Sequence, residues 1–337
     1  MVPVWLLPFL PYKTAFVPVK AGMDPHHESL FLGVQTECAF TNGCSSQASQ
    51  HGLPPLNDHI FEWHDLIAAI ECSTGQFNML ELGAGWAKWI VDATKITRKL
   101  NRTTRAVGVE AQPIHCKMAR RHILTNKAAP EASLLCGAVA SFDGTVRFPV
   151  KTQKQPFHNY GFGIQHIYDG KQAEIERGGG QIITVPAFSL CTLLHLRAFG
   201  AKHVDFVSLD IQSFEHAVLN ATLENLRCLD SRVAVLHISL HRVEENDARE
   251  IQHTMSTLLK WQLVRYMPLW TRKHPTPFGP INMVDGRLVF VNRKLAPSFT
   301  TVELNNPLMI HKGTYTQHPN KKLSRQPDWK GPNDYII

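Results

Sequence analysis

The sequence predicts an α/β fold in which helices cover both faces of a mostly parallel sheet. Three observations support this prediction. Short apolar runs alternate with helix-like segments between residues 57 and 260. Several runs end at an acidic residue, a histidine or a glycine turn, as buried parallel strands do where the chain enters a covering helix. Two late runs, 263–267 and 287–291, predict a closing antiparallel pair.

The individual elements follow from local signals along the chain. Asn57 and Asp58 offer an N-cap to a helix whose apolar residues recur at helical spacing. Pro113 suits the first position of a helix that runs to about residue 126, and Ser189 could cap a short helix through residue 199. Asp143 and Gly144 form a turn dipeptide before a hairpin arm. The expected strands are 77–82, 104–109, 133–139, 145–148, 203–209 and 232–240, and further helices follow residues 86 and 213 and cover 248–260.

Length and composition fit one α/β domain with extensions. The 337 residues are 44% hydrophobic and 19% charged, as in an ordinary globular chain. We expect an irregular N-terminal arm over 1–55, the main domain over 56–300 with a loop insert at 149–181, and a polar tail over 301–337. The apolar opening over 1–20 is interrupted by prolines and too short to cross a membrane, so a soluble protein is expected.

Charge and cysteine usage narrow the class of protein. The net charge is +7, but basic residues are spread over several segments, which favours a solvated surface over a nucleic-acid footprint. The seven cysteines include no Cys-x-x-Cys pair and several lie in apolar runs, which predicts free cysteines in a reducing, cytoplasmic compartment. The 18 histidines complete no recognisable ligand set, so no metal site is expected.

The turn at residues 81–86 is the central feature of the sequence. It reads Glu81-Leu82-Gly83-Ala84-Gly85-Trp86 and joins a buried strand to its helix. Glycines there allow a close approach of backbone to a ligand. Lys88 stands where a dinucleotide fingerprint needs a glycine, and the Gly-Lys-Ser/Thr of a phosphate loop is absent from the turn. The remaining pattern, acid-x-Gly-x-Gly, resembles motif I of S-adenosyl-L-methionine (SAM) methyltransferases.

That resemblance gives each residue of the turn an expected task. Gly83, Ala84 and Gly85 would lie against the methionine part of SAM, and Glu81 would help to hold its ammonium group. Trp86 would either lie over the cofactor or cover the sheet, and the sequence does not distinguish the two.

Other candidate residues lie at the ends of the neighbouring strands. In open parallel sheets, ligands bind outside the carboxyl ends of the strands, where the strand order reverses. Glu110 follows Gly85 by 25 residues (110 − 85), near the separation at which an acid binds ribose hydroxyls, and Ala111 lies beside it. Ala138 and Val139 mark the next strand end.

Catalysis by methyl transfer requires an in-line acceptor, and a base only if the acceptor is a hydroxyl. Asp210 is the first candidate base, with Glu215 and His241 as further candidates. Glu215 also has a structural interpretation, because an acid is favoured in the first turn of a helix and Ser213 would be the N-cap of that helix.

With these stretches in hand, the chain resembles the FkbM-type methyltransferases over residues 56–293. The resemblance rests on Phe61-Glu62-Trp63, on the turn at 81–86, and on the stretches 107–113, 138–144 and 204–215. It implies a class I methyltransferase-like (Rossmann-like) sheet of seven strands, SAM as cofactor, and O-methylation of a small-molecule or glycan hydroxyl. The chain departs from the family pattern with Ser208 in place of a lysine, Gln212 in place of a glutamate and Ser213 in place of a glycine.

These departures keep other functions open. A catalytically silent methyltransferase fold that serves as a binding or scaffold module is the main alternative. A nicotinamide-dependent oxidoreductase is disfavoured by Lys88. A base-methylating enzyme acting on nucleic acid is disfavoured because Asp210-Ile211-Gln212-Ser213 replaces the usual Asn/Asp-Pro-Pro-aromatic stretch. The sequence indicates neither the acceptor nor the oligomeric state.

Overall fold

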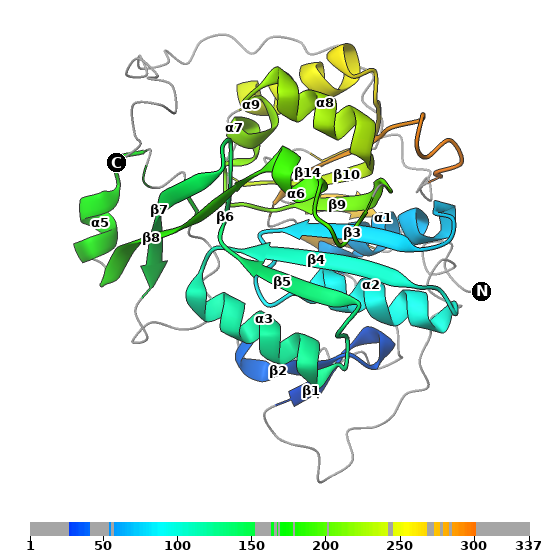
Figure 1. Ribbon diagram of the computed structural model, residues 1–337, viewed down its shortest axis with the longest axis horizontal. Helices are drawn as coiled ribbons and strands as arrows, with labels where there is room; N and C mark the ends of the chain where they lie inside the picture. Colours follow the sequence, from blue (N-terminus) through cyan, green and yellow to red (C-terminus); the bar gives the residue numbers. More distant parts are fainter. Residues whose placement is uncertain are drawn as a thin grey trace.

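A seven-stranded sheet forms the centre of the molecule (Figure 1), with strand order β11-β14-β10-β9-β3-β4-β5. The computed structural model describes residues 27–40, 54, 57–151, 163–164, 167, 169–177, 179–200, 202–241, 245–267, 273–276, 279–282 and 285–300. The strands of the central sheet are β3 (Phe77–Leu82), β4 (Thr104–Glu110), β5 (Ala132–Cys136), β9 (Val204–Leu209), β10 (Val233–Leu240), β11 (Gln262–Met267) and β14 (Gly286–Val291).

The direction of the strands confirms the predicted fold class. The pairs formed among β3, β4, β5, β9 and β10 are parallel, whereas β14 runs antiparallel to both β10 and β11. The chain adds β4 and β5 on one side of β3 and then crosses to β9 on the other side. The order therefore reverses between β3 and β9 in this class I methyltransferase-like arrangement. In such sheets, ligands bind outside the carboxyl ends of the strands at this point.

Helices cover both faces because each central strand is apolar on both sides. In β3, Phe77 and Met79 belong to one buried cluster, and Leu80 and Leu82 belong to the other. The first cluster packs under α1 (His59–Cys72), α2 (Lys88–Lys99) and α3 (Pro113–Thr125). The second packs under α6 (Leu190–Leu194), α7 (Glu215–Leu219), α8 (Leu223–Arg232) and α9 (Glu245–His253), on the opposite side of the sheet in Figure 1.

Capping residues explain where several helices begin. Pro113 opens α3 as predicted. The Ser189 hydroxyl accepts from the Thr192 amide at 3.2 Å and caps α6, but this helix ends at Leu194 instead of residue 199. Thr222 caps α8 through the Asn225 amide at 3.1 Å, which divides the expected helix after residue 213 into α7 and α8. The turn after α9, η4 (Thr254–Leu258), is a π-helix.

The apolar run at 133–139 is not one strand, as the sequence predicted, but two. It breaks at Gly137, where an added Cβ would lie 2.5 Å from the Phe188 ring and 2.8 Å from the Pro186 carbonyl oxygen. Beyond this glycine, β6 (Ala138–Ala140) joins a second sheet of order β6-β8-β7, made with β7 (Gly144–Lys151) and β8 (Gly180–Ser189). The close approach of β8 therefore coincides with the end of β5 at Cys136.

The segment expected to be a loop insert, 149–181, contains regular structure at both ends. The predicted hairpin arm extends as β7 to Lys151 and pairs antiparallel with β8, which starts at Gly180. Between them lies α5 (Gln172–Arg177). The insert is thus built on a hairpin.

The described part of the expected N-terminal arm is not irregular. It comprises β1 (His27–Ser29), η2 (Phe31–Gly33), β2 (Gln35–Glu37) and η3 (Cys38–Phe40). The Asn126 side chain binds the backbone of Gln35 in both directions, with its oxygen accepting from the amide and its nitrogen donating to the carbonyl, each at 2.8 Å. Phe31 is buried edge-to-face against Trp63, with ring centroids 5.0 Å apart. This segment, which we call the N-terminal cover (residues 27–40), is therefore part of the core.

The remaining elements are a small hairpin of β12 (Lys273–Thr276) and β13 (Gly279–Asn282). The apolar opening at 1–20 and the tail at 301–337 lie outside the described residues. Within the described part of the chain, every helix is too short or too polar to cross a bilayer.

The prediction that the cysteines are free is wrong for two pairs. Disulfides join Cys116 to Cys136 and Cys191 to Cys228, with Cα atoms 6.0 and 5.4 Å apart. These partners are 20 and 37 residues apart in sequence and meet only through the packing of their elements. The cysteine pattern therefore no longer supports a reducing, cytoplasmic compartment.

Candidate cofactor and acceptor site

The glycine turn after β3 packs directly against the chain after β9. Gly83 and Gly85 have φ values of 83° and 53°, in the left-handed region that glycine adopts without strain. A Cβ on Gly83 would lie 2.7 Å from the Asp210 carbonyl carbon and closer still to its oxygen. The Asp210 amide also donates to the Leu82 carbonyl at 2.8 Å. Gly83 is therefore needed for contact between the two strand ends.

Ala87, just after the turn, is a third residue with a left-handed backbone, in addition to Gly83 and Gly85. The sequence did not single it out. Ala87 has φ 64° and ψ 43° and is fully buried immediately before α2. A left-handed conformation is rare for alanine, so only the tertiary structure reveals it.

Glu81 anchors the start of the following helix. Its two carboxylate oxygens accept from the amides of Trp89 at 3.2 Å and Ile90 at 3.1 Å, at the N-terminus of α2. Burial raises its pKa well above the ordinary value, although these two amide bonds oppose the rise. Glu81 thus has a defined structural role, and its predicted contact with an ammonium group stays a prediction.

Glu110 meets the glycine turn, as the sequence predicted that it should. Its Oε2 accepts from the Gly85 amide and its Oε1 from the Gln112 amide, both at 2.7 Å. The residue is 7% exposed. A carboxylate offers about four acceptor positions, and His115 Nδ1 lies 3.7 Å from Oε1 as a third neighbour. Glu110 and Gly85 therefore form one small acceptor-and-donor unit at the carboxyl ends of β4 and β3.

The other expected cofactor residues directly follow Gly85 or Glu110 in the chain or lie on β6. Trp86 packs edge-on against His122 of α3, with centroids 4.8 Å apart, and lies 6.1 Å from Phe40 of the N-terminal cover. Burial lowers the pKa of His122 to about 3, so the ring is neutral. Ala138 and Val139 are buried on β6. Ala111 follows Glu110 directly and is partly buried.

The three predicted catalytic residues meet around one imidazole. His241 Nε2 lies 3.3 Å from Asp210 Oδ1, and His241 Nδ1 lies 3.4 Å from Glu215 Oε1. Asp285, just before β14, also lies 3.3 Å from His241 Nε2 and was missed in the sequence. It was missed because β14 is antiparallel, so its amino end reaches the edge where the parallel strands have their carboxyl ends.

This cluster has two titration properties that matter for acid–base chemistry. Burial raises the pKa of Asp210 to about 7; His241 lowers it, and Asp285 raises it further. The Asp210 side chain is nonetheless 39% exposed, so an acceptor can reach it. Burial alone would lower the pKa of His241, but Asp210, Asp285 and Glu215 together raise it well above the ordinary value.

Two of the residues that depart from the pattern given above, Gln212 and Ser213, lie against His241. Gln212 and Ser213 both adopt left-handed φ values, 59° and 77°. Gln212 Nε2 lies 3.0 Å from His241 Nε2, and the Ser213 hydroxyl donates to the His241 carbonyl at 2.6 Å. The prediction that Ser213 is the N-cap of α7 is therefore wrong, because Phe214 occupies that position. Glu215 Oε1 accepts from the Ile211 amide at 3.0 Å and fixes the same loop.

Ser208, the third departure, belongs to a buried network beneath the site. Its hydroxyl donates to Glu62 Oε1 at 3.1 Å, and Arg287 Nη1 lies 3.6 Å from Glu62 Oε2. All three residues are buried. Arg287 of β14 therefore places a positive charge beside Glu62.

Comparisons with known proteins add to this geometry. No protein-family model matches the chain. The chain is 22% identical over 223 residues to a "Putative methyltransferase" of Jannaschia sp. (strain CCS1), a match that covers 64% of this chain and 77% of that protein.

Several solved structures similar to the chain are methyltransferases. The FkbM methyltransferase from Methylobacillus flagellatus KT matches with a TM-score of 0.40 and 11% identity over 64% of this chain, and the match spans only 43% of that protein. An O-methyltransferase from Bacillus cereus in complex with SAH matches with a TM-score of 0.37 and 12% identity, covering 70% and 82% of the two chains. A "putative RNA methyltransferase" from Pyrococcus horikoshii matches with a TM-score of 0.34 and 9% identity, covering 68% and 81%.

Proposed function

We propose that the protein is a SAM-dependent methyltransferase that transfers a methyl group to a hydroxyl of a small molecule or glycan. One observation carries this proposal: Glu110 Oε2 accepts from the Gly85 amide at 2.7 Å. This contact brings the acid after β4 to the glycine turn after β3, at the point where the strand order reverses. The sequence relative supports methyl transfer, and the FkbM subtype rests on the motif resemblance.

The residues of the turn fit the parts of SAM. Glu110 would accept from the ribose hydroxyls, and the backbone of Gly83, Ala84 and Gly85 would approach the methionine part. Trp86, Ala111, Ala138 and Val139 would border the adenine. When bound, SAM supplies a methyl group on a positively charged sulfur, which an oxygen nucleophile displaces.

The protein's own contribution would be to hold the acceptor in line and to take its proton. Asp210 is the base in this proposal, because its carboxylate is reached by solvent and its pKa of about 7 leaves it partly ionised near neutral pH. His241 would orient that carboxylate from 3.3 Å, and Glu215 would hold the imidazole and the loop from the buried side. Excluding water from the crevice would favour the displacement.

A second function, a silent binding module, is favoured by the position of Gln212. Its amide lies 3.4 Å from Asp210 Oδ1 as well as 3.0 Å from His241 Nε2, so it competes with an acceptor for the same carboxylate. A silent module would bind SAM or its product without turnover, or would bind neither.

Calorimetric titration with S-adenosylhomocysteine tests the cofactor site. We expect saturable binding by the wild-type protein and a loss of at least about tenfold in affinity for Glu110→Gln. The side-chain NH₂ of the new glutamine would face the backbone N–H of either Gly85 or Gln112, so one of these two hydrogen bonds would be lost. Glu131→Gln is the matched control. Glu131 lies at the amino end of β5, whereas Glu110 lies at the carboxyl end of the parallel strand β4, and Glu131 pairs with Arg98 at 2.8 Å. Folded wild-type protein that fails to bind, or that binds NAD competitively, would overturn the proposal.

Turnover separates the two functions. Release of S-adenosylhomocysteine from SAM in the presence of hydroxyl acceptors, lost in Asp210→Ala, supports the enzyme. Binding of SAM without release of S-adenosylhomocysteine in the presence of glycan, phenolic and RNA acceptors supports the silent module. Release with RNA alone would show that the acceptor is RNA and not a small molecule or glycan.

A further inference from the structure

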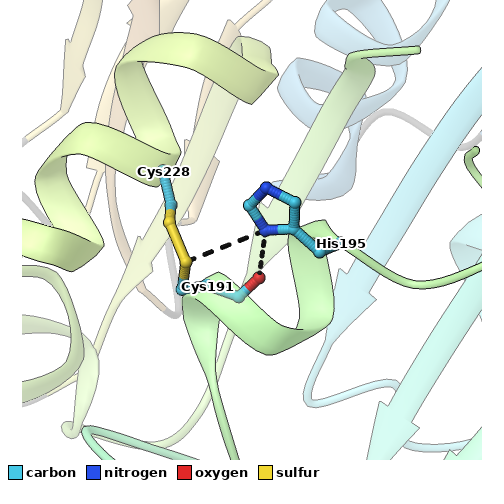
Figure 2. A group of neighbouring side chains, drawn as sticks. All are labelled: Cys191, His195 and Cys228. Carbon is cyan, nitrogen blue, oxygen red and sulfur yellow. Dashed lines mark hydrogen bonds between the residues drawn. A yellow bond between two sulfur atoms is a disulfide. The ribbon is translucent and has the colours of Figure 1, made fainter. Parts of the chain in front are cut away.

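A second candidate site lies between α6 and α8. Figure 2 shows Cys191 at the start of α6, His195 just after its end, and Cys228 on α8. His195 Nδ1 lies 3.7 Å from Cys191 Sγ and 2.8 Å from the Cys191 carbonyl oxygen. In the structure the two sulfurs are joined as a disulfide. Among the described residues, this is the group of three potential metal ligands whose ligand atoms all lie within 4.8 Å of one another.

The atoms are those that zinc prefers. Zinc binds thiolate sulfur at about 2.3 Å and imidazole nitrogen at about 2.0–2.1 Å in tetrahedral geometry, which places sulfur and nitrogen about 3.6 Å apart. The observed separation of 3.7 Å already matches this value. The two sulfurs would need to separate to about 3.8 Å. The Cα atoms are 5.4 Å apart, so side-chain rotation supplies most of this change.

The surroundings of Cys191, His195 and Cys228 are compatible with the disulfide and with a bound metal ion. His195 is exposed and Cys191 is partly exposed, so a reductant and then an ion can reach them, whereas Cys228 is buried. Arg232, also on α8, donates to the Leu194 carbonyl at 3.1 Å and to the Gly200 carbonyl at 2.9 Å. These bonds hold α6 against α8 when the disulfide is open, so the three ligands stay together.

We propose that the reduced Cys191–Cys228 pair, together with His195, binds one zinc ion. A dithiol reductant supplies two electrons and two protons to the disulfide, which becomes two thiols while the reductant becomes a disulfide. On binding Zn²⁺, the two thiols release two protons to solvent and bind as thiolates, and His195 binds as neutral imidazole, giving up its bond to the Cys191 carbonyl. Water completes the fourth position. The disulfide and the zinc complex are thus alternative cross-links between α6 and α8.

The test uses the full chain and Co²⁺ as the spectroscopic probe for this site. Protein reduced with a phosphine and freed of reductant is titrated with Co²⁺ and then with Zn²⁺. We expect thiolate-to-cobalt charge-transfer absorption that saturates at one equivalent and is abolished by Zn²⁺, and no such absorption from oxidised protein. His195→Ala should weaken binding at least about tenfold, while its exposed position leaves folding and disulfide formation intact.

The second disulfide provides the matched control. Cys136→Ser removes a sulfur from the Cys116–Cys136 pair and should leave the cobalt absorption unchanged, whereas Cys228→Ser should remove it. The proposal is overturned if reduced, folded protein shows no absorption, if Cys228→Ser retains it, or if His195→Ala binds as tightly as wild type.

Discussion

Gly83→Ala tests the contact between the end of β3 and the chain after β9. The new Cβ would lie 2.7 Å from the Asp210 carbonyl carbon, so the chain after β9 must move by about 1 Å or more to restore a normal contact. A left-handed alanine costs about 1–2 kcal/mol. Disturbing the bond from the Asp210 amide to the Leu82 carbonyl costs about a further 1–3 kcal/mol. The expected loss of stability is therefore about 2–5 kcal/mol.

Gly75→Ala is the matched control for this variant. Gly75 has a φ of 73°, close to the 83° of Gly83, but an added Cβ there meets nothing within 4 Å. It should cost only the conformational term, about 1–2 kcal/mol. Urea denaturation measures both losses, and titration with S-adenosylhomocysteine should show weakened binding for Gly83→Ala alone. Equal destabilisation of the two variants would refute the proposed packing of Asp210 on the glycine turn.

Three further outcomes are expected. Asp285→Asn removes a negative charge near Asp210, so the Asp210 pKa should fall from about 7 and its ionised form should persist to lower pH. NMR measurement of the Asp210 carboxyl ¹³C shift against pH would follow this titration. An unchanged titration midpoint would contradict the expectation. Asp65→Asn leaves Arg265 buried without its partner at 2.8 Å and should cost about 3–5 kcal/mol. Burial raises the Asp65 pKa, but Arg265 and His237 lower it overall to about 2. The stabilising effect of ionised Asp65 is therefore present above about pH 4 and is lost as pH falls through 2. An Asp65→Asn variant whose stability falls with acid in the same way as that of the wild type would refute this. Glu81→Gln should cost about 1 kcal/mol through the weakened start of α2, measured by thermal unfolding, and no change would contradict the helix-anchoring role.

The central sheet could be predicted because its signals are local. Glu81, Glu110 and Asp210 each follow an apolar run, and the carboxyl ends of parallel strands share one edge. The meeting of Glu110 with Gly85 was therefore predictable from order along the chain.

Other features depend on competition between local and distant partners. Ser213 carries the signal of an N-cap, but the His241 carbonyl takes its hydroxyl instead. Gly137 reads as part of a strand until the crossing β8 requires the bend. Asp285 has no strand-end pattern of its own, because it precedes an antiparallel strand. In each case the deciding partner is far away in sequence, so no local pattern contains the information.

The N-terminal cover has a practical consequence for any shortened form of the protein. A chain started at residue 56, at the boundary suggested by the sequence, would strip Phe40 from the Trp86 indole and Gln35 from Asn126. The exposed ring would border the very turn whose ligand binding such a fragment was made to measure. A fragment shortened at the N-terminus is therefore expected to lose ligand binding or to aggregate for reasons unrelated to chemistry at Asp210.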